Sequence, residues 1–270
     1  MYRFTNRGVG LLTSALLCRC LKNSLVRPIE QGYIRSPKHP HPVKGPTPAR
    51  KVLVFTHSAG FRHSYIPTAV EVVTKLGERS GAFEAFATEE PGDLDPGGLR
   101  EYAAILFLTT GELPLTDEQK LALIDYVKGG GGFVGVHNAA DTLYSFREYG
   151  EMLGGYFHSH PWTQVVRVVV EDQDHPSTRH LPRTFEVLEE VYTFRDWSRA
   201  RTHVLISLDT SSVDLSKGTR PDNDYALAWC HSYGRGRVFY TAFGHFTWLW
   251  RQDWFQKHLL GGILWAMGVA

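Results

Sequence analysis

A histidine lies within two residues of the end of three predicted strands. His57 follows the run 52–55, His137 follows the apolar run 132–136, and His245 follows the late strand 238–243. In an open α/β sheet, ligands bind beyond the carboxyl ends of the strands. Core packing would explain any one of these histidines, but three at one edge favour a functional site. Imidazoles there suit general acid–base work or metal ligation.

His137 stands at a turn with a known chemical use. The segment FVGVHNAAD, residues 133–141, reads as a strand that runs directly into a strand-to-helix turn. Such an elbow carries a nucleophilic Ser or Cys in several α/β enzymes, because the sharp turn pushes one side chain into a cleft. Here the protruding side chain is predicted to be an imidazole.

Further candidates lie in the second half of the chain. His158 and His160 are two residues apart, so both would face one side of an extended segment, as metal ligands, proton-transfer groups or a solvated loop. In LEEVYTF, one carboxylate of Glu189 and Glu190 could complete a metal shell or act as a base, or form a charged strand edge. We predict catalytic roles for His57, His137, Glu190 and His245, and metal ligation by His137, His158 and His160.

Other polar and aromatic residues are candidates for binding a substrate. Arg62 could clamp an anion or a carbohydrate hydroxyl, or pair at the surface. Trp229, Trp248 and Trp250 could stack on sugar faces, although core packing is expected for at least two of them. We expect His175, which precedes a proline, and His258 to be structural. The predicted substrate-binding residues are Arg62, His63, Asn138, Tyr192 and Trp229.

Alternating strand and helix patterns would position these side chains. Buried-strand runs are followed by amphipathic segments at 65–81 and 116–132, the second with a threonine cap and a glycine-rich end. This alternation predicts a mostly parallel, doubly wound sheet in three layers. After Gly155 the pattern becomes strand-rich, and a last helix over 253–267 is expected to pack on the sheet.

Composition narrows the functional class. Twenty-nine Lys and Arg against 28 Asp and Glu leave a net charge of +1, which gives no electrostatic case for nucleic acid. No nucleotide cofactor is indicated. Residues 1–50 form a basic extension with a proline-rich linker, which fits a transit peptide, a poor export signal or a mis-set start codon. The globular domain is predicted over 51–270, and the expected location is the cytoplasm, with export as the alternative.

Five segments together resemble the ThuA-like (trehalose utilisation) family. They are VLVFTHSAGFRH, GGGFVGVHNAAD, GGYFHSHP, EEVYTF and AWCHSYGRGRVFYTAFGH, in the family's order. The resemblance covers Lys51 to Gly268 and implies a flavodoxin-like core within the class I glutamine amidotransferase-like superfamily. Amidotransferases carry Cys at the elbow, where this sequence has His137. The resemblance therefore does not extend to glutaminase chemistry, and Cys230 lies on a late strand and cannot replace the nucleophile.

The resemblance implies a role in the breakdown of trehalose and related disaccharides through 3-keto-glycosides. A sugar oxidoreductase partner would oxidise C3, and the ketone would acidify neighbouring C–H bonds, so that a base could start an elimination or isomerisation. We therefore expect an enzyme that acts on a keto-sugar or glycoside, with Zn, Mn or Fe as a candidate cofactor. The alternatives are a non-catalytic sugar-binding module beside a dehydrogenase and a degenerate scaffold in a regulatory complex. The sequence leaves the oligomeric state open.

Overall fold

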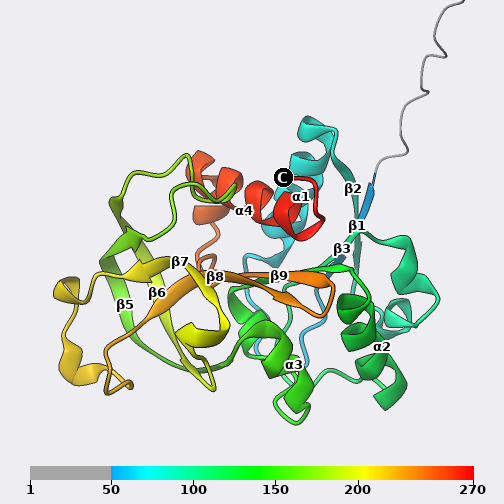
Figure 1. Cartoon of the computed structure of the whole chain (residues 1–270), viewed down its shortest axis with the longest axis horizontal. Helices are drawn as coiled ribbons and strands as arrows, with labels where there is room; N and C mark the ends of the chain where they lie inside the picture. The colour runs from blue at the N-terminus through cyan, green and yellow to red at the C-terminus, as the bar shows by residue number, and fades with distance from the viewer. Residues whose placement is uncertain (1–49) are drawn as a thin grey trace, which may run out of the picture. The chain divides into compact units, whose positions relative to one another are not determined.

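A computed structural model describes residues 50–270, and predictions that concern residues 1–49 lie outside this range. One mixed sheet of nine strands organises the described residues, in the order β2-β1-β3-β4-β9-β8-β7-β5-β6 (Figure 1). The strands are β1 (Arg50–Phe55), β2 (Phe83–Thr88), β3 (Ala104–Phe107), β4 (Gly132–Val136), β5 (Tyr156–Val170), β6 (Thr184–Arg195), β7 (His203–Leu208), β8 (Ala226–Tyr233) and β9 (Gly236–Thr241).

Four α-helices accompany this sheet. They are α1 (Ile66–Ser80), α2 (Asp117–Lys128), α3 (Arg147–Leu153) and α4 (Asp253–Ala266). Sequence signals account for two of the helix ends. Thr116 and Gln119 form a reciprocal capping box at the start of α2, and α1 ends at Gly81, whose φ of 62° suits glycine.

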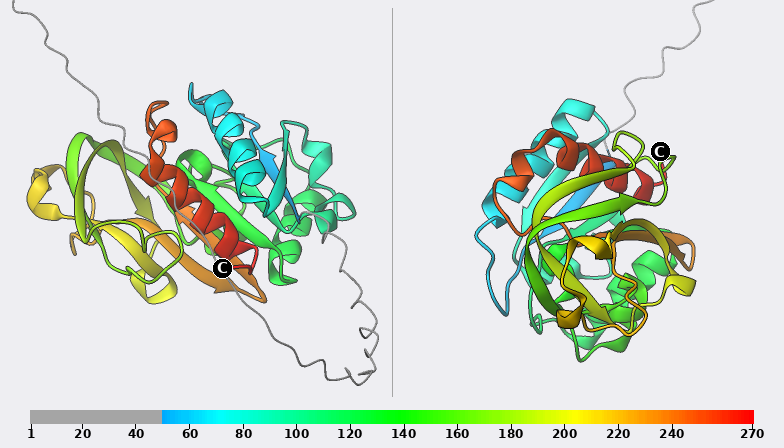
Figure 2. Two further views of the ribbon diagram at one scale, coloured as in Figure 1. Left: turned by 90° about the horizontal axis from the view of Figure 1, so that it is seen from above. Right: turned by 90° about the vertical axis from the view of Figure 1, so that its left-hand side faces the viewer.

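The helices cover both faces of the parallel half of the sheet. Strands β2, β1, β3, β4 and β9 pair in parallel. Helices α1 and α4 contact each other on one side, and α2 and α3 contact each other on the other side (Figures 1 and 2). Strands β3 and β4 are completely buried, which explains their unbroken apolar sequences. The prediction of an α/β fold is thus confirmed.

The prediction of a mostly parallel sheet was wrong. From β9 to β6 every strand pairing is antiparallel, and more residue pairs in the whole sheet are antiparallel than parallel. Antiparallel neighbours can be joined by tight turns and need no crossover helix. Accordingly, no α-helix interrupts the chain between α3 and α4, where this half is formed. The flavodoxin-like classification stays a prediction.

No helix among residues 50–270 is long and apolar enough to cross a bilayer. The core extends through both halves of the sheet and includes Trp162, Trp229 and Trp250, none of which exposes more than 1% of its surface. Two of the three tryptophans that were weighed for sugar stacking, Trp229 and Trp250, are therefore core residues, as expected.

Candidate functional site

His137 occupies a strained elbow at the end of β4. The strand stops at Val136, and a short 3₁₀ turn begins at His137. The backbone of His137 has a φ of 45°, in the left-handed region that favours glycine. The histidine side chain is fully buried. A bulky residue held in such a conformation is typical of functional sites, where the surrounding structure compensates for the strain.

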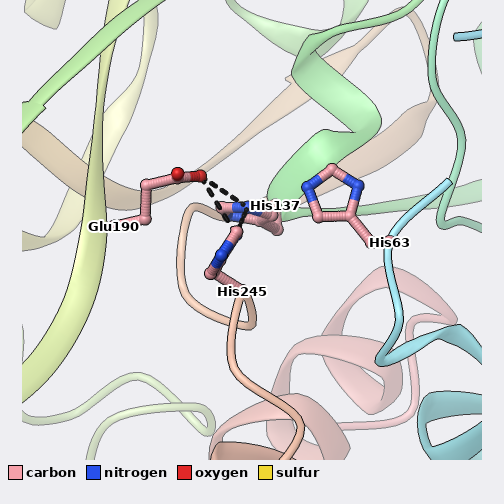
Figure 3. A group of neighbouring side chains, drawn as sticks. All are labelled: His63, His137, Glu190 and His245. Atoms are coloured by element: carbon pink, nitrogen blue, oxygen red, sulfur yellow. Dashed lines mark hydrogen bonds and ion pairs between the residues drawn. The ribbon is translucent and has the colours of Figure 1, made fainter. Parts of the chain in front are cut away.

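Three other side chains converge on His137, as Figure 3 shows. His63 comes from the loop after β1, His245 from the loop after β9, and Glu190 from β6 in the antiparallel half. One nitrogen or carboxylate oxygen from each of the four residues lies within 4.8 Å of all the others. We call His63, His137, Glu190 and His245 the His-Glu cluster.

Three donor atoms form the tight part of the cluster. Glu190 Oε2 lies 3.4 Å from His137 Nε2 and 3.0 Å from His245 Nδ1. The two imidazole nitrogens are 3.2 Å apart. His63 completes the group from the far side of His137 (Figure 3). Its ring meets that of His137 edge-on, with the ring centroids 5.2 Å apart.

Hydrogen bonds outside the cluster orient the rings. His137 Nδ1 lies 2.7 Å from the carbonyl oxygen of Ala242 and donates to it, which leaves the lone pair of Nε2 facing Glu190 and His245. Asn138 Nδ2 contacts His63 Nδ1 at 3.3 Å, so the other ring nitrogen of His63 faces the cluster (Figure 3). The Tyr65 hydroxyl in turn donates to Asn138 Oδ1.

Glu189 connects the strand that carries Glu190 to the loop that carries His245. One carboxylate oxygen of Glu189 accepts the backbone N–H of Gly244, and the other accepts the N–H of Glu190, each at 2.9 Å. The side chain is almost fully buried, and burial raises the pKa of Glu189 to about 7. This carboxylate holds the antiparallel half against the edge where the parallel strands end.

Electrostatics favour a charged carboxylate surrounded by imidazoles. Burial by itself would raise the pKa of Glu190, but the neighbouring imidazoles of His137 and His245 outweigh burial and keep this pKa well below its usual range. The bond to Glu190 raises the pKa of His245. Burial lowers the pKa of His137, and burial together with the neighbouring histidines lowers the pKa of His63 to about 4. At neutral pH, Glu190 is ionised and His63 and His137 are neutral.

This donor set fits a divalent transition metal. Neutral imidazoles and one carboxylate are the preferred protein ligands of Zn²⁺ and of related ions. Four ligands about 2.0–2.1 Å from a tetrahedral ion are separated from one another by roughly 3.3 Å. The separations of 3.0 to 3.4 Å within the tight part match this value. The carbonyl and amide partners behind His137 and His63 are the outer contacts that metal-ligating histidines commonly make.

The two histidines of the predicted H-x-H pair lie in different places relative to the site. His160 lies on the rim, about half exposed, with Nδ1 3.3 Å from Glu190 Oε1. His158 is exposed and lies outside the His-Glu cluster. The pairing register of β5 shifts between Phe157 and Ser159 and again between Ser159 and Trp162, so simple alternation does not hold here. The structure thus places His63, Glu190 and His245 beside His137 in place of His158 and His160.

Two predicted site residues on the loop after β1, His57 and Arg62, also lie outside the His-Glu cluster. His57 Nδ1 lies 2.9 Å from the carbonyl oxygen of Glu89, and Arg62 forms an ion pair with the Glu89 carboxylate. Both side chains therefore face the segment that follows β2. His63, one residue after Arg62, is the histidine of this loop that reaches the site.

Of the remaining predicted substrate-binding residues, Tyr192 lies at the site and Trp229 does not. The Tyr192 ring packs on His137, with the ring centroids 4.1 Å apart. Trp229 is fully buried, and its indole N–H donates to the carbonyl of Leu153. Trp229 has no surface on which a sugar could stack, so this prediction is corrected.

Sequence reasoning missed Tyr65 and the structural role of Glu189. Tyr65 directly precedes α1, a position with no local signal for a buried hydroxyl that orients an amide. Glu189 was weighed only as an alternative to its neighbour Glu190. The two adjacent acids on β6 offered a signal. Which of them joins the cluster and which bonds to the backbone of a loop depends on the tertiary contacts of each.

The chain belongs to the ThuA family. The family model described as trehalose utilisation matches residues 51–266. No curated protein matches the sequence.

Solved structures agree with this assignment. A ThuA-like protein from Bacteroides uniformis ATCC 8492 is 25% identical, with a TM-score of 0.69, over 84% of this chain and 95% of that chain. Another, from Parabacteroides merdae ATCC 43184, shares the fold at 20% identity and a TM-score of 0.64, over 81% and 90% of the two chains. A β-galactosidase from Bacillus circulans sp. alkalophilus shows fold similarity to 81% of this chain over 30% of its own length, at 13% identity and a TM-score of 0.50.

Proposed function

We propose that this protein is an enzyme of carbohydrate catabolism that acts on glycosides or 3-keto-glycosides by acid–base chemistry at a divalent metal. Membership of the trehalose utilisation family supports the carbohydrate class. The observation that carries the proposal is the convergence of His63, His137, Glu190 and His245 at the sheet edge. A stable fold alone gives no reason to gather three imidazoles, two of them buried, around one ionised carboxylate.

The cluster residues would hold the ion through His137 Nε2, His245 Nδ1, Glu190 Oε2 and the inward nitrogen of His63. A divalent cation bound there would act as a Lewis acid toward a carbonyl or hydroxyl oxygen of the substrate. The hydrogen bond to Ala242 fixes the tautomer of His137, and Glu190 supplies a negative charge that favours cation binding. His160 stays outside this donor set and can move a proton at the rim, next to Glu190 Oε1.

A 3-keto-glycoside is the substrate class that this arrangement fits. A base removes the proton on C2, the C1–C2 double bond forms, and the C1–O bond breaks. The leaving oxygen then takes up a proton, and no net oxidation occurs. His160 is our candidate for the proton transfer. A sugar oxidoreductase acting earlier would supply the C3 ketone.

Metal analysis and turnover of the same variants test the proposal. We expect about one equivalent of Zn, Mn or Fe in the full chain and its loss in His137→Ala and Glu190→Gln. The matched control is His57→Ala, which removes a strand-end histidine outside the cluster. Conversion of 3-keto-trehalose, followed by mass spectrometry, should disappear with the metal and persist in the control. Metal-free protein, or full turnover by His137→Ala, would contradict the proposal. Binding of trehalose without any conversion of keto-sugars would favour the non-catalytic binding module.

A further inference from the structure

Two exposed aromatic side chains are connected to the His-Glu cluster, one by contact with His63 and the other through Phe246. Seven large apolar side chains of the described residues are strongly exposed, and only two of these are aromatic: Phe61, 70% exposed, and Trp248, 41% exposed. Phe61 lies on the loop after β1 and Trp248 on the loop after β9. These are the two loops that also carry His63 and His245.

Ring contacts connect both aromatics to the cluster. Phe61 packs edge-on against His63, with the ring centroids 4.9 Å apart. On the other loop, Trp248 stacks on Phe246, with the ring centroids 6.3 Å apart. Phe246 in turn packs edge-on against His245, with the ring centroids 4.8 Å apart. The ring centroids of His63 and His245 are 5.5 Å apart. We call Phe61, His63, His245, Phe246 and Trp248 the aromatic strip.

The backbone beneath the exposed rings is anchored. Thr110 Oγ1 donates to the carbonyl of Phe61 at 2.8 Å. The N–H of Arg251 donates to the carbonyl of Trp248 at 3.1 Å, and the N–H of Leu249 donates to the carbonyl of Phe246 at 3.0 Å. An aromatic ring that stays in water does not contribute the free energy of folding that its burial would provide. Aromatic rings on an anchored backbone at the rim of a polar site are typical of ligand recognition, because aromatic walls and a few polar groups together orient a ligand.

We propose that Phe61 and Trp248 form a stacking platform for the pyranose rings of the substrate. Phe61 lies at the His63 end of the aromatic strip, and Trp248 lies at the His245 end. The inference rests on the proposed function, because it takes the substrate to be a saccharide. A pyranose has an apolar face of C–H groups that packs on an aromatic ring, while its hydroxyls point outward. With stacking at both ends of the strip, the bond between two sugar units would lie over the His-Glu cluster. The platform thus selects a disaccharide over a single sugar.

Calorimetric titration of the full chain with trehalose, and separately with methyl α-glucoside, tests this inference. We expect trehalose to bind more tightly than the monosaccharide. Trp248→Ala should weaken trehalose binding about tenfold, equivalent to the loss of one good apolar contact, and Phe61→Ala should also weaken it. Trp248→Phe should restore most of the affinity. Leu121→Ala is the matched control, since it removes a 52% exposed side chain on α2 and should leave binding unchanged.

A parallel Zn²⁺ titration of each variant separates this inference from the proposed function. Loss of trehalose binding with retained Zn²⁺ binding in Trp248→Ala supports both. Trehalose binding that depends on Trp248 in a protein with no affinity for Zn²⁺ supports the platform and overturns the metal chemistry. Unchanged trehalose binding by the Phe61→Ala, Trp248→Ala double variant, or no saccharide binding by the wild-type chain, overturns the platform.

Discussion

Among residues 50–270, two groups of mostly buried histidines differ in what surrounds them. In the His-Glu cluster, three imidazoles converge on the ionised Glu190. The second group consists of His175 and His258, which flank Ser177 near helix α4. His258 Nδ1 donates to the carbonyl of Ser177 at 2.9 Å, and its Nε2 lies 3.1 Å from the Thr241 hydroxyl. His175 Nδ1 lies 2.8 Å from Ser177 Oγ.

The two groups differ in whether their ring nitrogens are available to a ligand and in whether a carboxylate lies next to the rings. Both ring nitrogens of His258 are used by the fold, and among residues 50–270 no carboxylate is hydrogen-bonded to the imidazole ring of His175 or of His258. In the cluster, one nitrogen of each of His63 and His137 is held from behind while the other faces the shared centre. Burial alone therefore does not identify a functional histidine. Convergence of unused lone pairs on one negative charge does so.

The largest expected effect follows from removing that charge. Glu190→Gln should keep the fold but reduce metal affinity and turnover by at least about 100-fold, because the site loses an anionic ligand. Metal content and activity assays measure this effect, and Ser177→Ala in the second group is the control. Equal activity of Glu190→Gln and wild type would show that the Glu190 charge does not distinguish a functional histidine group from a structural one.

Acid should destabilise the protein through the second group. Burial lowers the pKa of His258 to about 3 and that of His175 to about 4, against 6.5 for an unperturbed histidine. As the pH falls from 6.5 toward 4, these two histidines bind protons in the unfolded chain but stay neutral in the folded chain. The free energy of unfolding therefore decreases. The contribution of His258 is on the order of 3 kcal/mol across this window.

Urea denaturation at several pH values measures this contribution. His258→Gln removes the titrating group and should flatten the pH dependence between 6.5 and 4 relative to wild type. Glu189 acts with the opposite sign, because its raised pKa makes the folded chain bind a proton between pH 7 and 4.5. The comparison therefore uses the difference between the two proteins, and parallel curves would show that His258 titrates normally in the folded state.

A smaller effect is expected from the outer contacts of the cluster. Asn138→Ala removes the amide that holds His63 and should lower Zn²⁺ affinity by about 10-fold, as is typical for groups that orient a metal ligand. Circular dichroism should show an unchanged fold. If affinity stays at the wild-type value, His63 needs no such support, and the tight part of the cluster alone holds the ion.

The smallest effect is expected at the strand-end histidine outside both groups. His57→Ala removes a ring that lies beside the Glu89 carbonyl and the Phe55 ring, outside the His-Glu cluster. Turnover should change less than about twofold, as is usual for a surface substitution. A large loss of activity in His57→Ala with metal retained would move the substrate site toward the loop after β2.

The sequence by itself determined the edge of the sheet at which the site is found. Local sequence signals placed α1, α2, α4 and the buried parallel strands, because a helix or strand must turn its apolar residues inward wherever it packs. The short helix α3 was not predicted. The histidines after β4 and β9 followed from the same argument. The family resemblance was also readable from short segments, and the family model confirms it.

Only the tertiary structure decided which side chains meet. His57 and His63 share one loop, yet the path of residues 58–62 brings His63 to the cluster and leaves His57 beside Glu89. Glu190 arrives from the antiparallel half, whose position depends on pairings between strands far apart in the chain and on the hydrogen bonds of Glu189. Such contacts depend on long-range packing, which leaves no periodic trace in the sequence. Trp229 and Trp248 illustrate the same limit, since the same residue type is core in one place and exposed in the other.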